Sequence, residues 1–277
     1  MHCPDKKGII AAVTNFIHQR NGNIVYIDQY VDRIQSAFFM RIEIEGHFNQ
    51  TDFKKFKTTF HESLGKTFQM SCSFYLASVL PKMAVFVSKY DHCLYDILAQ
   101  QSSGKLACTI PFIVSNHKDL EPIAKQFKIP FYHIPVTKEN KENAEFKQLD
   151  LLKQYEVNCI VLARYMQIVS SRIIDVYPSK IINIHHSFLP AFPGAKPYHS
   201  AFQRGVKIIG ATSHYVTEEL DAGPIIEQDT IRVSHEHEVK DFILKGQDLE
   251  RIVLLRALKL HCERKIMTYN NKTIVFN

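Results

Sequence analysis

The pattern of apolar and polar positions changes character near residue 77. Before it, Ile9, Val13, Phe16 and Ile17 recur at helical spacing after Asp5, a predicted helix N-cap. The same periodicity analysis predicts, in order, a strand over 24–31, a strand over 37–45, a helix over 53–64 and a strand over 68–77. This order is that of a ferredoxin-like βαββαβ unit that lacks most of its first strand.

After a predicted linker over residues 78–82, short apolar runs alternate with helical periodicity. The runs predict strands over 83–87, 107–114, 131–134, 157–162, 181–184, 207–215 and 225–233. The helices are predicted from about 92, from about 119, over 144–155 and over 239–262. This alternation is typical of a parallel sheet covered on both faces. We therefore predict an α/β chain, with an α+β unit over 1–77 and a Rossmann-like domain over 83–277.

Composition narrows the classes of ligand. Among 277 residues, 34 are Lys or Arg and 28 are Asp or Glu, a formal charge of +6 that forms no block. A dispersed excess suits a small anionic molecule at least as well as nucleic acid, for which clustered basic residues are expected. Glycine occurs 10 times, whereas average usage of about 7% would give roughly 19, which argues against a glycine-rich nucleotide cradle.

Cysteine spacing and hydropathy indicate the compartment. The six cysteines include no CxxC pair, so they are expected to be reduced thiols. The apolar runs are too short for a membrane span, and the first residues form no signal peptide. We expect a cytoplasmic protein that binds neither membranes nor nucleic acid.

Polar residues gather where strands of the larger domain end, which is where open α/β sheets bind ligands. Asn183 and His185 are two residues apart, so on an extended segment they point the same way. An amide and an imidazole directed at one volume suit an oxyanion in acyl chemistry. Asp221, in a loop tightened by Gly223-Pro224, could take a proton from water or hold an imidazole protonated.

Three segments carry a resemblance to a known family. Asn183-Ile-His-His-Ser-Phe-Leu-Pro, Gly210-Ala-Thr-Ser-His and Leu220-Asp-Ala-Gly-Pro resemble the formyltransferase fold that handles 10-formyltetrahydrofolate. Within that group, His185-His186 and Phe192-Pro-Gly-Ala-Lys-Pro-Tyr-His are similar to formyltetrahydrofolate deformylases. The N-terminal unit is similar to an ACT domain. The resemblance implies hydrolysis of 10-formyltetrahydrofolate, with formate supplied to purine synthesis, one-carbon pools balanced, and neither metal nor cofactor.

The resemblance also implies roles for individual residues. It makes Asn183, His185 and Asp221 the catalytic set. The residues implied to line the folate pocket are Tyr165, Met166, Gln167, Ile168 and Val169 on one wall, and Val216, Thr217 and Leu220 on the other. The residues expected to support the catalytic set are His186, Ser187 and His214.

Plainer interpretations stand beside these roles. His214 could equally be a core residue, and without the resemblance Met166 and Ile168 would be interpreted as core residues at a strand end. No GxSxG surrounds Ser187, which favours a structural hydroxyl. A metal at His185, His186 and His214 is disfavoured because adjacent residues of an extended segment face opposite ways.

One departure from the family pattern indicates which molecule receives the formyl group, the acceptor of the reaction. Related glycinamide ribonucleotide formyltransferases have a glycine- and asparagine-rich loop after the first strand of this domain, which holds a phosphate at a helix N-terminus. Here residues 87–94 contain no glycine, and Asp91 would repel a phosphate. Water is therefore the predicted acceptor.

Two other functions remain open from the sequence. One is formyl transfer to a non-phosphorylated amine, and the other is amino-acid sensing with an inactive formyl domain. The ACT resemblance implies an amino-acid effector. The missing first strand exposes a strand edge, which predicts a homo-oligomer.

Overall fold

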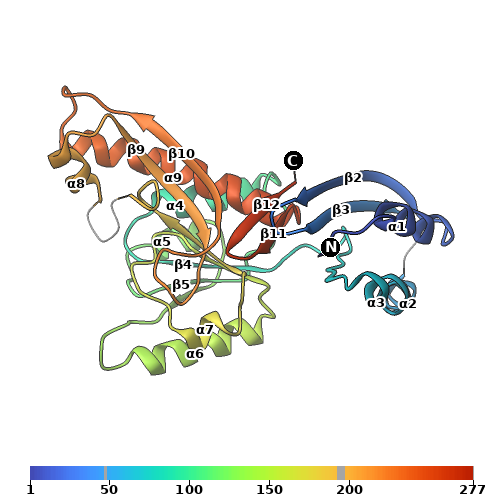
Figure 1. Ribbon diagram of the computed structural model, residues 1–277. Coiled ribbons are helices and arrows are strands. Elements are labelled where there is room, and N and C mark those ends of the chain that lie inside the picture. Colours follow the sequence, from blue (N-terminus) through green and yellow to red (C-terminus); the bar gives the residue numbers. More distant parts are fainter. Residues whose placement is uncertain (47–48, 192–196, 277) are drawn as a thin grey trace. The chain divides into compact units, whose positions relative to one another are not determined.

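The chain forms two compact units in a computed structural model that describes residues 1–46, 49–191 and 197–276 (Figure 1). One unit comprises Met1–Val79 together with Phe276, and the other comprises Leu80–Val275. Among the described residues, no helix is both long and apolar enough to cross a membrane.

The smaller unit is an antiparallel sheet of three strands with helices. Its elements are β1 (His2–Pro4), α1 (Ile9–His18), β2 (Asn23–Asp32), β3 (Ala37–Glu45), α2 (Gln50–Phe60), a π-helical turn (His61–Gly65) and α3 (Lys66–Phe68). The strand order is β1-β3-β2, so β2 lies at an edge. Val13 and Phe16 of α1 pack with Met40 of β3 and Phe60 of α2 in one buried core.

Two details of this unit correct the sequence-based expectations. The predicted strand over 68–77 is wrong: Lys66–Phe68 is helical, and the following segment makes one bridge, between Ser71 and His2. The short first strand explains this, because a last strand that would pair with β1 meets only three residues there. The predicted N-cap is also wrong, since α1 follows Gly8, whose φ is 90°.

The larger unit contains a sheet of seven strands in the order β10-β9-β8-β7-β4-β5-β6. Its strands are β4 (Met83–Val87), β5 (Ile113–Ser115), β6 (Phe131–His133), β7 (Cys159–Leu162), β8 (Ile181–His185), β9 (Ile208–Tyr215) and β10 (Ile225–Arg232). Its helices are α4 (His92–Ser102), α5 (Glu121–Gln126), α6 (Lys141–Gln154), α7 (Ser171–Ile174), α8 (Pro197–Arg204) and α9 (Val239–Cys262). The five strands from β8 to β6 are parallel, whereas β9 and β10 run antiparallel to their neighbours.

Helices cover both faces of this sheet, as the apolar runs predict (Figure 1). Met83, Val85 and Val87 of β4 share one core with α4, α5 and α9. Ala84 and Phe86 alternate with them and share the opposite core with α6 and α7. Because both faces of β4 are buried, its run is continuously apolar.

Three features of the larger unit depart from the sequence-based expectations. The strand expected over 107–114 shrinks to β5, because Pro111 has no N–H to donate to a ladder. Helices α7 and α8 were not predicted. Nor was the hairpin of β11 (Ile266–Tyr269) and β12 (Lys272–Val275), whose turn residues Asn270 and Asn271 have φ values of 46° and 58°. Two turn residues with positive φ are the sign of a type I′ hairpin, which an Asn-Asn pair allows.

Candidate active site

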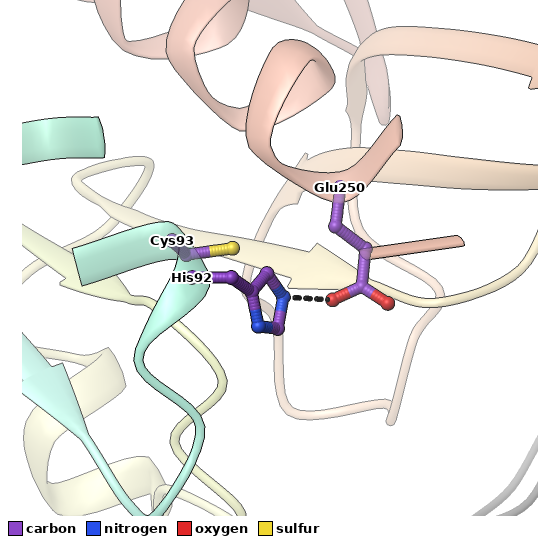
Figure 2. A group of neighbouring side chains, drawn as sticks. All are labelled: His92, Cys93 and Glu250. Atoms are coloured by element: carbon purple, nitrogen blue, oxygen red, sulfur yellow. Dashed lines mark hydrogen bonds and ion pairs between the residues drawn. The ribbon is translucent and has the colours of Figure 1, made fainter. Parts of the chain in front are cut away.

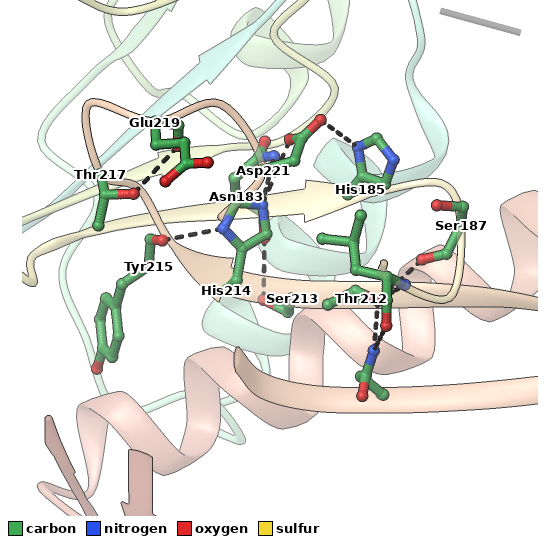
Figure 3. A network of polar contacts seen from close by, with 12 residues as sticks. Asn183, His185, Ser187, Thr212, Ser213, His214, Tyr215, Thr217, Glu219 and Asp221 are labelled. Atoms are coloured by element: carbon green, nitrogen blue, oxygen red, sulfur yellow. Dashed lines mark hydrogen bonds and ion pairs between the residues drawn. The ribbon is translucent and has the colours of Figure 1, made fainter. Parts of the chain in front are cut away.

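Three segments bring polar side chains together at the end of the sheet (Figure 3). Asn183 and His185 lie on β8, and β9 pairs His214 directly with Asn183. The loop after β9 carries Asp221, whose backbone has a φ of 56°. A positive φ is uncommon for a residue other than glycine and marks a backbone held in place by its surroundings.

Asp221 is the centre of this cluster. Its Oδ2 lies 3.3 Å from His185 Nδ1, and its Oδ1 lies 3.7 Å from His214 Nε2. The contacts with His185 and then His214 outweigh partial burial and hold the pKa of Asp221 well below its ordinary value. Asp221 is therefore an anion at neutral pH, placed to stabilise positive charge on His185.

The backbone fixes the tautomer of His214. Its Nδ1 lies 2.9 Å from the Tyr215 carbonyl oxygen, which can only accept, so Nδ1 carries the proton. In the neutral ring Nε2 then accepts from the Asn183 amide, 3.2 Å away, whereas a second ring proton, on Nε2, would face Asp221 Oδ1. This contact orients the amide and leaves its second N–H for another partner.

His185 has one ring nitrogen committed and one unpartnered. Nδ1 faces the carboxylate of Asp221, which accepts its hydrogen. Nε2 is buried and has no hydrogen-bond partner among the described residues. Buried polar atoms in native proteins are almost always paired, so an orphaned nitrogen next to a carboxylate–imidazole pair favours a ligand contact there.

Gly223 is a steric requirement of the Asp221 loop. A Cβ at this position would lie 1.8 Å from the Tyr215 carbonyl oxygen, which is the same oxygen that fixes His214. The loop also closes through the Tyr215 N–H, which donates to the Pro224 carbonyl at 2.9 Å. Only glycine allows this close approach.

Gly223→Ala is therefore expected to lower both activity and stability. Displacement of the Tyr215 carbonyl would disturb His214 and Asp221 together, lowering kcat by more than about tenfold, and overpacking would cost about 1–3 kcal/mol. Steady-state kinetics and urea unfolding measure the two effects. Gly104→Ala is the control, because open space surrounds Gly104 and only its φ of 74° opposes the change. Equal kcat for the two variants would contradict this account of Gly223.

The residues implied to line a folate pocket take different positions. Tyr165 is buried, and its hydroxyl accepts from Gln148 at 3.0 Å. Gln167, Ile168 and Val169 line a narrow cleft of about 10 Å³ together with Tyr165 and residues of α6. Four residues predicted to line the folate pocket do not line this cleft: Met166, Val216, Thr217 and Leu220. Met166 and Leu220 are exposed, and the folate pocket itself stays a prediction.

The supporting residues hold the segment after β8. The Ser187 hydroxyl donates to the Ala191 carbonyl at 2.7 Å, consistent with a structural hydroxyl. The His186 ring packs edge-on to the Tyr198 ring, with centroids 5.8 Å apart. Residues 192–196, which include part of the motif that begins at Phe192, lie outside the described residues.

A second polar cluster next to this site was not predicted from the sequence (Figure 2). Glu250 of α9 is fully buried, and its Oε2 lies 2.9 Å from His92 Nε2. Its Oε1 accepts from the Tyr198 hydroxyl at 2.6 Å and lies 3.5 Å from Arg164 Nη1. The available signal was a carboxylate on the apolar face of α9, beside Leu249 and Val253.

The same cluster brings a possible set of metal ligands together. Atoms of His92, Cys93 and Glu250 lie within 4.8 Å of one another. Burial raises the pKa of Cys93 well above its ordinary value, so the thiol is protonated and a poor ligand. Although burial opposes it, contacts with His92 and Arg164 hold the pKa of Glu250 low. Arg164 thus already supplies the positive charge that a metal would bring, and these residues fit an internal ion pair better.

Comparison with known proteins shows which class of protein the larger unit belongs to. Residues 81–258 match the family model for formyl transferases, and residues 1–51 match the model for the ACT domain. The larger unit is thus of the formyl transferase class. A glycinamide ribonucleotide transformylase from Symbiobacterium toebii has a similar structure, with a TM-score of 0.68 and 25% identity, covering 75% of this chain and 99% of that one.

Relatives that match almost the whole chain narrow the class. The formyltetrahydrofolate deformylase of Synechocystis sp. is 50% identical, covering 99% of this chain and 96% of its own. That of Bacillus subtilis is 45% identical, with 99% and 92% covered. The crystal structure of a formyltetrahydrofolate deformylase from Pseudomonas syringae has a TM-score of 0.96 and 42% identity, covering 100% of this chain and 92% of that one. The chain therefore belongs to the formyltetrahydrofolate deformylase family.

Proposed function

We propose that this chain hydrolyses 10-formyltetrahydrofolate to tetrahydrofolate and formate. The observation that carries the proposal is the Asp221 carboxylate held against His185 and His214, beside the Asn183 amide. It is supported by relatives that are named formyltetrahydrofolate deformylase and that match this chain over almost its whole length. The formate would serve purine synthesis, and the reaction would balance one-carbon pools.

The first step develops negative charge on the formyl oxygen. The free N–H of Asn183 and the Nε2–H of a protonated His185 would donate to this oxygen. The orphaned, buried Nε2 supports that role, because the oxyanion supplies the missing partner. Asp221, on the other side of the ring, would stabilise the imidazolium while it donates.

Proton transfers complete the hydrolysis. The water oxygen forms a bond to the formyl carbon, and Asp221 takes a proton from this water. The bond between the formyl carbon and N10 then breaks, and His185 gives its Nε2 proton to N10. Asp221 is a weak base while the imidazolium faces it, so it takes this proton only as the new bond to carbon makes the water acidic. Formate leaves, and solvent restores the two protonation states.

Formate release without any amine acceptor tests this function. The wild-type protein, incubated with 10-formyltetrahydrofolate, is expected to yield formate and tetrahydrofolate in equal amounts. Asn183→Ala should lower the rate by about 10²–10³, the usual effect of losing one oxyanion donor. Absence of formate in the wild-type reaction would contradict the proposal, and product that appears only with an added amine would indicate a transferase.

The folate would lie between the two segments implied by the resemblance. Tyr165, Met166, Gln167, Ile168 and Val169 would form one wall. Val216, Thr217 and Leu220 would form the other. Leu220 is exposed beside Asp221, as a side chain that packs against a bound ring would be before binding.

The N-terminal unit would serve regulation and assembly. We propose residues 1–77 as an ACT-like regulatory domain, 78–82 as linker and 83–277 as the catalytic domain. Edge strand β2 carries the exposed side chains Val25, Ile27 and Tyr30, which support a homo-oligomer. An amino-acid effector would bind in the ACT-like domain.

No metal or organic cofactor is needed for this reaction. N–H groups supply the electrostatic stabilisation that a metal would otherwise provide, and folate is the substrate. We also propose a cytoplasmic location, which the six free cysteines support because reducing compartments keep thiols unpaired.

A further inference from the structure

Arg164 lies at the point where this sheet would admit an acceptor. From β4 the chain continues to β5 and β6 on one side and returns through β7 and β8 on the other. The crevice outside the carboxyl ends of β4 and β7 is therefore the switch point at which open α/β sheets bind ligands. Arg164 follows β7 by two residues, and Tyr90 follows β4 by three.

The Arg164 side chain links these two strand ends. Its guanidinium carbon lies 4.6 Å from the centre of the Tyr90 ring, and Nη1 lies 3.5 Å from Glu250 Oε1. The residue is 7% exposed, and Glu250 is fully buried. A buried cation, held by an aromatic face and a buried carboxylate, therefore lies at this switch point.

Arg164 and the proposed catalytic residues belong to neighbouring strand ends of the sheet. Leu162 of β7 is in register with Asn183 of β8, so Arg164 and His185 leave the same end of neighbouring strands. A chain of contacts also joins them, through His186 and the Tyr198 ring to Glu250. The formyl group held by Asn183 and His185 would therefore lie next to the crevice that contains Arg164.

Two features favour a role for Arg164 beyond the ion pair with Glu250. Its backbone has a φ of 61°, a conformation that costs side-chain-bearing residues energy and often marks a functional site. Its Nε and Nη1, and the neighbouring His92 Nδ1, are buried without a hydrogen-bond partner among the described residues. Unsatisfied nitrogens at a ligand crevice favour a bound ligand or water.

We propose that Arg164 determines whether water or an amine receives the formyl group. Its fixed guanidinium lies where an attacking amine would have to bind. Primary amines are mostly ammonium ions at neutral pH, and a guanidinium repels them. Water is small and neutral, and it can accept from the unpartnered Arg164 nitrogens. The inference rests on the proposed hydrolysis and explains why hydrolysis would prevail over transfer.

Replacing Arg164 should open a transfer reaction. In Arg164→Gly, the amine nitrogen of added glycinamide would bond to the formyl carbon, the bond from that carbon to N10 would break, and the proton lost by the amine would go to N10. Glycine suits the positive φ, so the backbone need not move. The matched control is Arg172→Ala, which removes a guanidinium that also stacks on an aromatic ring and pairs with a glutamate, Glu142, but lies on α7.

The experiment measures formate and N-formylglycinamide separately after incubation with 10-formyltetrahydrofolate and glycinamide. Wild type and Arg172→Ala should give formate with at most a trace of N-formylglycinamide, which sets the reference ratio. Arg164→Gly should raise the ratio of formylated amine to formate by more than about tenfold, as expected when a like charge is removed. The ratio does not depend on how much total activity survives.

The outcomes separate this inference from the proposed function. A wild type that releases no formate would overturn the function and the inference together. A folded Arg164→Gly that yields formate alone, or neither product, would overturn the inference only. If the buried Glu250 charge prevents folding, Arg164→Gly combined with Glu250→Gln removes that charge, and the same ratio decides the question.

Discussion

Asp221→Asn is expected to lower kcat by about 10²–10⁴, the range over which a positioned proton acceptor contributes. Asparagine keeps the shape of the side chain but has no charge to stabilise an imidazolium and cannot take a proton from water. Steady-state formate release measures the loss. Asp229→Asn is the matched control, because Asp229 lies on β10, partly exposed and paired with Arg256. Near-parental kcat in Asp221→Asn would contradict the assigned role.

The same substitution has a second readout in the pH dependence of stability. The folded pKa of Asp221 lies below its unfolded value, so its contacts stabilise the protein above about pH 4 and are lost as the pH falls through the folded pKa. The difference in free energy of unfolding between wild type and Asp221→Asn should therefore be larger at pH 7 than at pH 3. A difference that grows on acidification would show that the carboxylate is not stabilised by its neighbours.

Glu250→Ala is expected to lower the free energy of unfolding by about 3–5 kcal/mol. The truncation leaves the Arg164 guanidinium buried without its counterion, and the Tyr198 hydroxyl loses its acceptor. Urea unfolding at pH 7 measures the loss. Glu142→Ala removes a carboxylate that pairs with Arg172 at the surface, so about 1 kcal/mol or less is expected there. Similar losses in the two variants would contradict the importance of the buried cluster.

Sequence patterns predicted those elements that local residues decide. The bounds of β3, β4 and α9 agree with the prediction, because strict alternation, a short apolar run and a long amphipathic stretch each have one interpretation. The strand expected over 68–77 failed for a non-local reason. Its residues alternate correctly, but its ladder depends on the length of β1, which offers three residues.

In the candidate site, too, local spacing could be predicted from the sequence, whereas contacts made by non-local packing could not. The spacing of Asn183 and His185 placed them on one side of β8, and both lie in the network around Asp221. The second polar cluster, around Glu250, could not be predicted in this way. Its His92 and Glu250 are separated by 158 positions and meet only through the packing of α4 on α9. A buried carboxylate on an apolar helix face was the one local sign of it.

Hydrolysis in H₂¹⁸O tests the central claim most directly, because water is the acceptor only if its oxygen enters the product. Wild-type protein and 10-formyltetrahydrofolate, with no amine present, should give formate that carries one ¹⁸O atom, at a rate that Asp221→Asn lowers by at least about 10². Formate without the label, or labelled formate released equally fast by Asp221→Asn, would contradict the account.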